Sequence, residues 1–260
     1  MKPTEKFIRQ CRKEIKSQGE NFRLACSSRD WMALANAENY SYHFQWLSRP
    51  IIQYPQDIVA VQEIIWKVKP DLIIETGIAH GGSMILSASM LALLDLSEAI
   101  EAGEKSIDPN GSKRTVVGID IDIRSHNRSA IEAHPMAGRI KMIEGSSTEP
   151  TVVSEVWKTA ADCRRVMVFL DSMHTHDHVL AELEAYAPMV SMGSYCIVFD
   201  TIIEDMPEGS FPDRPWGRGN NPKTAVWNFL QTHREFEIDK EIEHKLLITV
   251  APDGFLRRIE

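Results

Sequence analysis

The sequence has few cysteines, no excess of basic residues and no long hydrophobic run. Its four cysteines form no Cys-x-x-Cys pair and show no regular spacing, which excludes a disulfide framework and is typical of a reducing cytoplasm. Acidic residues outnumber basic ones by 37 to 29, for a net charge of −8, so nucleic acid is not an expected partner. The most apolar stretch, Ser83–Leu96, is too short to span a membrane. The charged first residues lack the apolar segment of a signal peptide.

Short apolar runs alternate with helix-length segments from residue 58 onward. The runs that predict strands are Asp71–Glu75, Thr115–Asp120, Ile140–Glu144, Val166–Asp171 and Tyr195–Asp200. The segments that predict helices are Ser83–Leu96, Ser125–Ala133, Pro150–Thr159, His176–Val190 and Pro222–His233. Near-continuous apolar strands separated by helices are typical of a parallel sheet covered on both faces, so we expect a doubly wound, mostly parallel α/β fold.

The two ends of the chain differ from this pattern. Lys2–Asn39 is charged, with apolar residues at helical spacing, and predicts a helical N-terminal cap over residues 1–52. Residues 53–260 would form the sheet domain. At the C-terminus, Lys245–Val250 and Phe255–Ile259 flank a Pro-Asp-Gly turn, which predicts an antiparallel hairpin.

Small and acidic residues follow the first three predicted strands. Glu75–Ser83 contains three glycines and opens a helix, which suits close approach of a ligand, although a simple turn is an alternative. Asp120 and Asp122 could accept hydrogen bonds from a ribose or could cap a helix. Glu144–Ser147 is again polar and small. Because the carboxyl ends of parallel strands share one edge, the three together indicate a nucleoside-bearing ligand.

Acidic residues also end the fourth and fifth strands. Asp171 and Asp200 are well placed to hold a hard cation such as Mg²⁺. His174 follows Asp171 closely, and imidazole titrates near neutral pH, which suits a general base. His176 and His178 are expected in the first turn of the next helix.

The loop Ile202–Asn221 is rich in proline and glycine, and its place beside this edge favours a lid, with disorder as the alternative. The groups that it could present to a substrate are Trp216, Arg218, Asn220 and Asn221.

Several of these motifs, in order, carry a resemblance to a known family. They are KPDLIIETGIAHGGS, GIDIDIR, EGSS, LDSMH and WGRGNNPKTAV, within a match from about Gln53 to Arg258. The chain resembles the cephalosporin hydroxylase / rhamnosyl O-methyltransferase family, which has the class I S-adenosylmethionine (SAM) methyltransferase fold. The resemblance implies a SAM-dependent O-methyltransferase that acts on the hydroxyl of a sugar, in a small molecule or a glycan. We also expect the protein to be a homo-oligomer, and the cysteine usage places it in the cytoplasm.

The resemblance also implies roles for individual residues. The residues that would bind SAM are Glu75, Gly77, Ala79, Gly81, Ser83, Asp120, Asp122, Ser146, Ser147 and Asp171. Among them, the Glu75–Ser83 turn would hold the methionine part, Asp120 the ribose, and Ser146 and Ser147 would lie near the adenine. Asp171 and Asp200 would bind Mg²⁺, and His174 would be the general base.

The chain departs from the family pattern at two positions. Phe199 stands where the family usually has a glutamate before Asp200, and Met173 stands where an aspartate is often present. Either water completes a metal site at Asp171 and Asp200, or Glu204 or Asp205 substitutes, or the metal is dispensable.

Three other classes of protein are alternatives to this interpretation. An iron and 2-oxoglutarate oxygenase needs a two-His, one-carboxylate triad, usually on a β-barrel, and the alternating strands and helices exclude it. A metallohydrolase could use the HTHDH run at His174–His178, although one residue of the usual zinc spacing is missing. A non-catalytic or metal-independent SAM-binding relative is the third alternative, and Phe199 is the feature that keeps it open.

Overall fold

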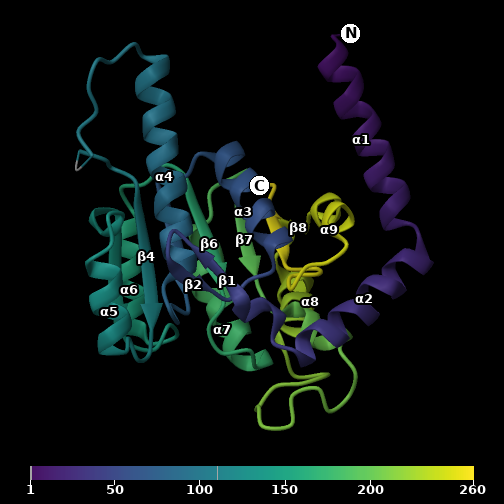
Figure 1. The fold of residues 1–260 in the computed structure, drawn as a ribbon. Coiled ribbons are helices and arrows are strands. Elements are labelled where there is room, and N and C mark those ends of the chain that lie inside the picture. Colours follow the sequence, from purple (N-terminus) through teal and green to yellow (C-terminus); the bar gives the residue numbers. More distant parts are fainter. Residues whose placement is uncertain (1, 110) are drawn as a thin grey trace.

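The computed structural model describes residues 2–109 and 111–260 and begins with two helices and a small hairpin. These elements are α1 (Pro3–Gly19), α2 (Phe22–Ala37), the short 3₁₀ helix η1 (Tyr40–His43), β1 (Phe44–Trp46) and β2 (Arg49–Ile51). In Figure 1, α1 extends away from the body of the molecule. The hairpin instead packs on the body, where the Trp46 indole N–H donates to the Ser89 hydroxyl at 3.0 Å. The proposed division at residues 52 and 53 stays a prediction.

The centre of the protein is a seven-stranded sheet in the order β5-β4-β3-β6-β7-β9-β8. Its strands are β3 (Leu72–Thr76), β4 (Thr115–Asp120), β5 (Ile140–Glu144), β6 (Val166–Leu170), β7 (Tyr195–Val198), β8 (Phe236–Ile238) and β9 (Phe255–Arg258). The first five of these in sequence are parallel to one another, and β9 is antiparallel to both of its neighbours, β7 and β8. The strand order reverses between β3 and β6, which is where ligands bind in such sheets.

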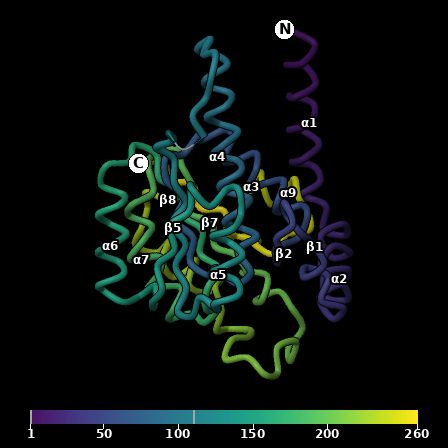
Figure 2. Tube along the Cα trace, turned by 60° about the vertical axis from the view of Figure 1, so that its left-hand side comes forward, coloured from purple at the N-terminus to yellow at the C-terminus, as the bar shows by residue number. Residues whose placement is uncertain are grey.

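Helices cover both faces of this sheet. They are α3 (Pro55–Val68), α4 (Gly82–Glu101), α5 (Ser125–Glu132), α6 (Pro150–Ala160), α7 (His176–Tyr186), α8 (Pro222–Thr232) and α9 (Lys240–Leu246), with 3₁₀ turns η2 (Ala137–Arg139), η3 (Ala187–Met189) and η4 (Thr201–Asp205). Alternate residues of β3 enter two separate cores, Ile73 with α3 and α4, and Leu72 and Ile74 with α6 and α7. Figure 2 shows α6 and α7 on one side of the sheet and α3 and α4 on the other. The predicted doubly wound α/β fold is confirmed.

The predicted C-terminal hairpin is wrong in one of its strands. Lys245–Val250 does not form a strand, because its first residues complete α9 and the rest run as irregular chain. The antiparallel partner of β9 is β8, and β9 also pairs with β7. The segment is held by tertiary contacts instead: Leu246 and Ile248 pack on the core, and Val250 donates its N–H to Asp57 of α3 at 3.0 Å.

Helix α4 is longer than its predicted segment and is the most apolar helix at the centre of the fold. By length and composition it is the one helix of the described residues that could cross a membrane, yet 56% of its most apolar window is buried inside the protein. Burial of this kind is typical of a core helix packed on a sheet. The absence of a membrane span stays a prediction, which this packing supports.

Asp57 generates a prediction about stability and pH. Its carboxylate is fully buried, accepts hydrogen bonds from the Thr249 hydroxyl and the Val250 N–H, and has a pKa raised by burial to about 7. Because the unfolded chain has the ordinary pKa of about 3.9, the folded protein binds this proton more tightly, and the free energy of unfolding falls as pH rises from about 4 to about 7.

Asp57→Asn should remove this decline, since the amide imitates the protonated carboxyl. Urea unfolding at about pH 5 and about pH 8 should show the variant gaining stability relative to wild type at the higher pH. An equal difference at both values would contradict the prediction.

Candidate functional site

The turn between β3 and α4 is built around buried hydrogen bonds and glycine. Glu75 is buried in β3, and its carboxylate accepts hydrogen bonds from the hydroxyls of Ser83 and Ser87 on α4. Burial raises the pKa of Glu75, and the two serine bonds counteract part of this. Ser83 therefore lies in the predicted SAM-binding turn, and its hydroxyl donates to Glu75.

Glycine is required where this turn meets the end of β6. Gly77 has φ +88°, and a Cβ built there would lie 2.0 Å from the Asp171 carbonyl oxygen. Gly81 has φ +82° and faces the Ile131 side chain. Ala79 is exposed, with φ 46°. The turn is thus pressed against the β6 strand end at the switch point of the sheet.

Asp120 ties the end of β4 to the same turn. Its carboxylate accepts the backbone N–H groups of Ile78 at 2.8 Å and Ala79 at 3.3 Å, and that of Asp122 at 3.2 Å. Asp122 is exposed. Helix α5 begins at Ser125 with Arg124 at the N-cap position, so the capping role that the sequence left open for the two aspartates is not seen.

The loop after β5 is held by α7. Ser147 is buried, its hydroxyl lies 3.2 Å from His178 Nε2, and its carbonyl accepts the Tyr186 hydroxyl at 2.5 Å. Ser146 lies beside it, with its hydroxyl 3.1 Å from that of Thr148. The two serines predicted near the adenine are therefore at the same sheet edge as Asp120.

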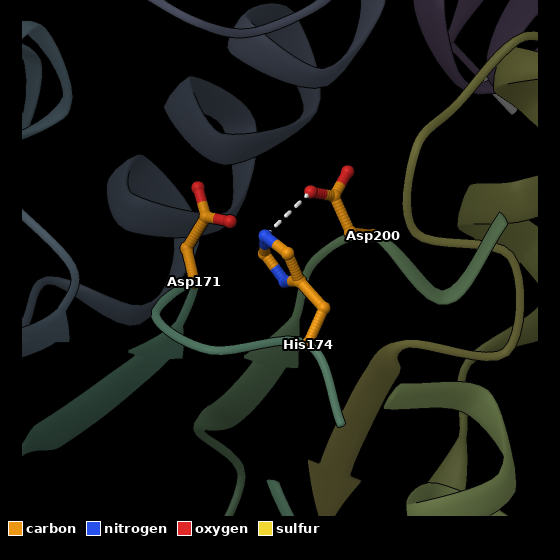
Figure 3. Close-up of side chains that lie close together, drawn as sticks. All are labelled: Asp171, His174 and Asp200. Atoms are coloured by element: carbon orange, nitrogen blue, oxygen red, sulfur yellow. Dashed lines mark ion pairs between the residues drawn. The ribbon is translucent and has the colours of Figure 1, made fainter. Parts of the chain in front are cut away.

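Asp171, His174 and Asp200 come together beyond the ends of β6 and β7 (Figure 3). One ligand atom from each lies within 4.8 Å of the others, and among the described residues this is the one such group of three. His174 Nε2 is 3.2 Å from Asp200 Oδ2. Burial, and then the negative charges of Asp200 and Glu75, raise the pKa of Asp171 well above its usual range.

This donor set fits a divalent cation. Two carboxylates and an imidazole are common ligands of such ions, and a cation between Asp171 and Asp200 would relieve their repulsion. The missing family glutamate is not replaced from nearby. Phe199 is buried against Phe169, Glu204 accepts the Gly219 N–H at 2.7 Å, and Asp205 pairs with the Lys223 ammonium. The third residue of the cluster is His174, which the sequence indicated as a base and which faces Asp200.

The predicted lid loop brings one of its four candidate residues to this cluster. The Trp216 ring meets the His174 ring edge-on, with centroids 4.8 Å apart. Arg218 is exposed, and Asn220 accepts the His176 N–H at 2.9 Å. Asn221 is buried as the N-cap of α8, and its amide group donates to Glu204 and to the Gly217 carbonyl. In this conformation Asn221 holds the loop and has no free group for a substrate.

The histidines of the HTHDH run separate in space. His174 faces Asp200, whereas His176 contacts Thr224 at 2.8 Å and His178 contacts Ser147 and Ser172. Within the described part of the chain they form no shared zinc site, which removes the support for a metallohydrolase. His178 and its neighbour Glu182 at i+4 were missed as site residues, and only that spacing could have pointed to them.

Comparison with known proteins agrees with this geometry. The sequence model of the family described as Rhamnosyl O-methyltransferase/CmcI matches residues 38–259. A rhamnosyl O-methyltransferase of Mycobacterium tuberculosis (strain ATCC 25618 / H37Rv) is 27% identical over 207 residues, covering 78% of this chain and 73% of that protein. One from Mycobacterium leprae (strain TN) is 26% identical over 216 residues, covering 82% of each.

Solved structures share the fold. One titled "cmcI-D160 Mg-SAM" superposes with a TM-score of 0.52 at 17% identity, covering 84% of this chain and 78% of that one. The apo structure of CalS11, titled as a TDP-rhamnose 3'-O-methyltransferase, gives 0.51 at 16% identity, with 80% and 81% covered.

The strand order and the acidic strand ends define the class I methyltransferase fold. Within that class, the chain belongs to the Rhamnosyl O-methyltransferase/CmcI family, which confirms the resemblance inferred from the motifs. Its assignment as a methyltransferase is confirmed at the level of the family.

The contact of Gly77 with β6 gives a prediction for stability. Gly77→Ala should lower the free energy of unfolding more than Gly103→Ala, because both glycines have positive φ but only Gly77 faces backbone. The left-handed conformation alone costs a non-glycine residue about 1–2 kcal/mol, which is the expected loss at Gly103. Gly77→Ala should exceed it by roughly 2 kcal/mol in chemical denaturation. Equal losses would mean that the turn moves away from Asp171 at little cost.

Proposed function

We propose that this protein transfers the methyl group of SAM to a hydroxyl of a sugar or a sugar-containing acceptor. The observation that carries the proposal is the Asp171–His174–Asp200 cluster, which lies beside the glycine turn at the switch point of a methyltransferase sheet. The sugar acceptor is supported by the names of the relatives, which are rhamnosyl O-methyltransferases at 26–27% identity over most of the chain.

SAM would lie across the ends of β3, β4 and β5. The Glu75–Ser83 turn would hold the methionine part, Asp120 and Asp122 the ribose, and Ser146 and Ser147 the adenine side. The half-buried Asp120 carboxylate already fixes the turn, so one residue would align two parts of the cofactor site. A solved structure of the same fold, titled as an Mg-SAM complex, supports SAM as the cofactor.

Asp171 and Asp200 would hold a divalent cation, with Mg²⁺ the expected ion and His174 at the same site. Bound there, the ion would act as a Lewis acid that lowers the pKa of the acceptor hydroxyl. Burial, and then the negative charges of Asp200 and Glu75, raise the pKa of Asp171, and a cation at this position would offset both effects.

His174 would take the proton of the acceptor hydroxyl. As that proton moves to the imidazole, the acceptor oxygen attacks the sulfonium methyl carbon and the carbon–sulfur bond breaks, with its electron pair going to sulfur. Asp200, 3.2 Å from His174 Nε2, would stabilise the imidazolium, and Trp216 would keep the ring in place. Most of the rate would come from holding the two reactants in line.

The acceptor, the cellular location, the oligomeric state and the role of the N-terminal cap are part of the same proposal. The acceptor is a small molecule or glycan, the protein acts in the cytoplasm as a homo-oligomer, and the N-terminal cap over residues 1–52 shapes the acceptor pocket or an oligomer contact. A metal-independent or non-catalytic SAM-binding relative is the second candidate, because the buried Phe199 removes one family carboxylate.

His174→Ala should reduce the rate of methyl transfer by about 10²–10⁴-fold, because the positioned base is lost. Binding of S-adenosylhomocysteine, measured by calorimetry, should be unchanged. His176→Ala is the matched control, since this neighbouring histidine faces Thr224 and not the cluster, and it should keep near-full turnover. Near-full turnover of the His174 variant would exclude the base role.

Asp200→Asn should weaken binding of Mg²⁺ or Mn²⁺ by about tenfold or more, because one of two charged ligands is neutralised. Calorimetric titration with the metal alone measures this independently of turnover. Asp213→Asn removes an exposed carboxylate from the nearby loop and should bind the ion like wild type. A wild-type protein that binds neither ion but transfers methyl groups would support the metal-independent alternative.

A further inference from the structure

Helix α7 connects the loop after β5, where the adenine side of SAM is proposed to lie, with the loop after β6, which begins at Asp171. From its first turn and its middle, side chains reach Ser147 in the loop after β5 and Ser172 directly after Asp171. These loops belong to β5 and β6, which are not neighbours in the sheet. Strands β4 and β3 lie between them, so no strand pairing joins the two loops directly, and side chains of α7 supply the contacts that do.

The anchor of this connection is Glu182. Its side chain is fully buried, and Oε1 accepts the Ser172 hydroxyl at 2.6 Å and lies 3.4 Å from His178 Nε2. Its other oxygen, Oε2, has no hydrogen-bond partner within the described residues. Removing a carboxylate from water is costly, and a buried carboxylate with one oxygen unpaired is not explained by stability alone.

His178 extends the connection to the second loop. Its Nε2 is 3.2 Å from the Ser147 hydroxyl and 3.2 Å from the Ser172 hydroxyl, so one ring nitrogen faces both loops and Glu182 together. Tyr186, one turn beyond Glu182 on α7, holds the Ser147 carbonyl at 2.5 Å. Ser147 is thus fixed at its side chain and at its backbone by the same helix.

We propose that Glu182 is a positioning residue for cofactor binding, which acts through Ser172 and His178 to set the spacing of the two loops around the adenosyl group. The inference rests on the proposed SAM site. Among the described residues Glu182 makes no hydrogen bond or ion pair with the cluster, and its negative charge acts on Asp171 only at a distance. Its loss should therefore weaken cofactor binding and leave proton transfer at His174 intact.

The experiment compares Glu182→Leu with Glu182→Gln. Leucine is close in size but removes the acceptor, whereas the glutamine carbonyl still accepts from Ser172 and His178. Calorimetric titration with S-adenosylhomocysteine should show at least a tenfold loss of affinity for the leucine variant and a loss within about threefold for the glutamine variant. Glu184→Leu, which changes an exposed carboxylate on the same helix, is the matched control and should bind like wild type.

Steady-state kinetics separates positioning from a general structural defect. Glu182→Leu should raise the KM for SAM by at least tenfold, with kcat and the KM for the acceptor within about threefold of wild type. A lower kcat with unchanged KM values for SAM and for the acceptor, together with an unchanged Kd for S-adenosylhomocysteine, would overturn the proposal. If the leucine variant does not fold, Ser172→Ala and His178→Ala each cut one side of the connection, and full affinity in both would overturn it.

The same titration distinguishes the two levels of the proposal. A wild-type protein that does not bind S-adenosylhomocysteine overturns the proposed function and this inference with it. A wild-type protein that binds, together with variants at residue 182 that bind equally well, overturns this inference alone.

Discussion

The candidate site depends on several negatively charged side chains that lie close together at one edge of the sheet. Parallel strands bring Glu75 of β3, Asp171 after β6 and Asp200 after β7 to the same edge, and their mutual repulsion adds to burial in raising the pKa of Asp171. Such crowding is unfavourable in a protein without ligands. In the proposed function, a bound sulfonium or divalent cation would reduce this repulsion, and the reduction would contribute to its affinity.

Each carboxylate at this edge is held in a different way. Glu75 is held by two serine hydroxyls of α4, Asp120 by the backbone of the glycine turn, and Glu182 by Ser172. Neutral donors keep these three groups in place without neutralising them. Among the described contacts, His174 is the one side chain that faces Asp171 and Asp200, and no hydroxyl donor holds them. We therefore propose these two carboxylates as the cation ligands.

Most of the fold could be predicted from the sequence because its strands are buried on both faces. A strand such as Thr115–Asp120 has to be apolar along its whole length, and its bounds were predicted to the residue. The segment Lys245–Val250 is also a short, mostly apolar run, yet its conformation depends on α9 and on Asp57, which lies 193 residues from Val250 in the chain. Local pattern carries no information about such a distant partner.

The places of several candidate site residues in the fold could also be predicted from the strand pattern, although their roles stay predictions. The rule that ligands bind beyond the carboxyl ends of parallel strands locates Asp120, Asp171 and Asp200 without any knowledge of packing. It does not show that Asn221 caps a helix or that His178 faces Glu182, because those contacts depend on how α7 and α8 are placed in three dimensions. Residues on strand ends are found from sequence, whereas residues that hold them are found from structure.

The position of Asp200 suggests how the site could lose the glutamate that the family usually has at residue 199. Phe199 directly follows β7 and is buried against Phe169, while Asp200 turns into the left-handed region (φ 55°), which aspartate adopts more readily than most residues. A carboxylate has two oxygens, so Asp200 can face a cation with one and hold His174 with the other. In the proposed mechanism one residue then ties the base to the ion, and the loss at residue 199 lowers the affinity for the cation without releasing the base. A site arranged in this way tolerates a missing ligand better than a missing Asp200.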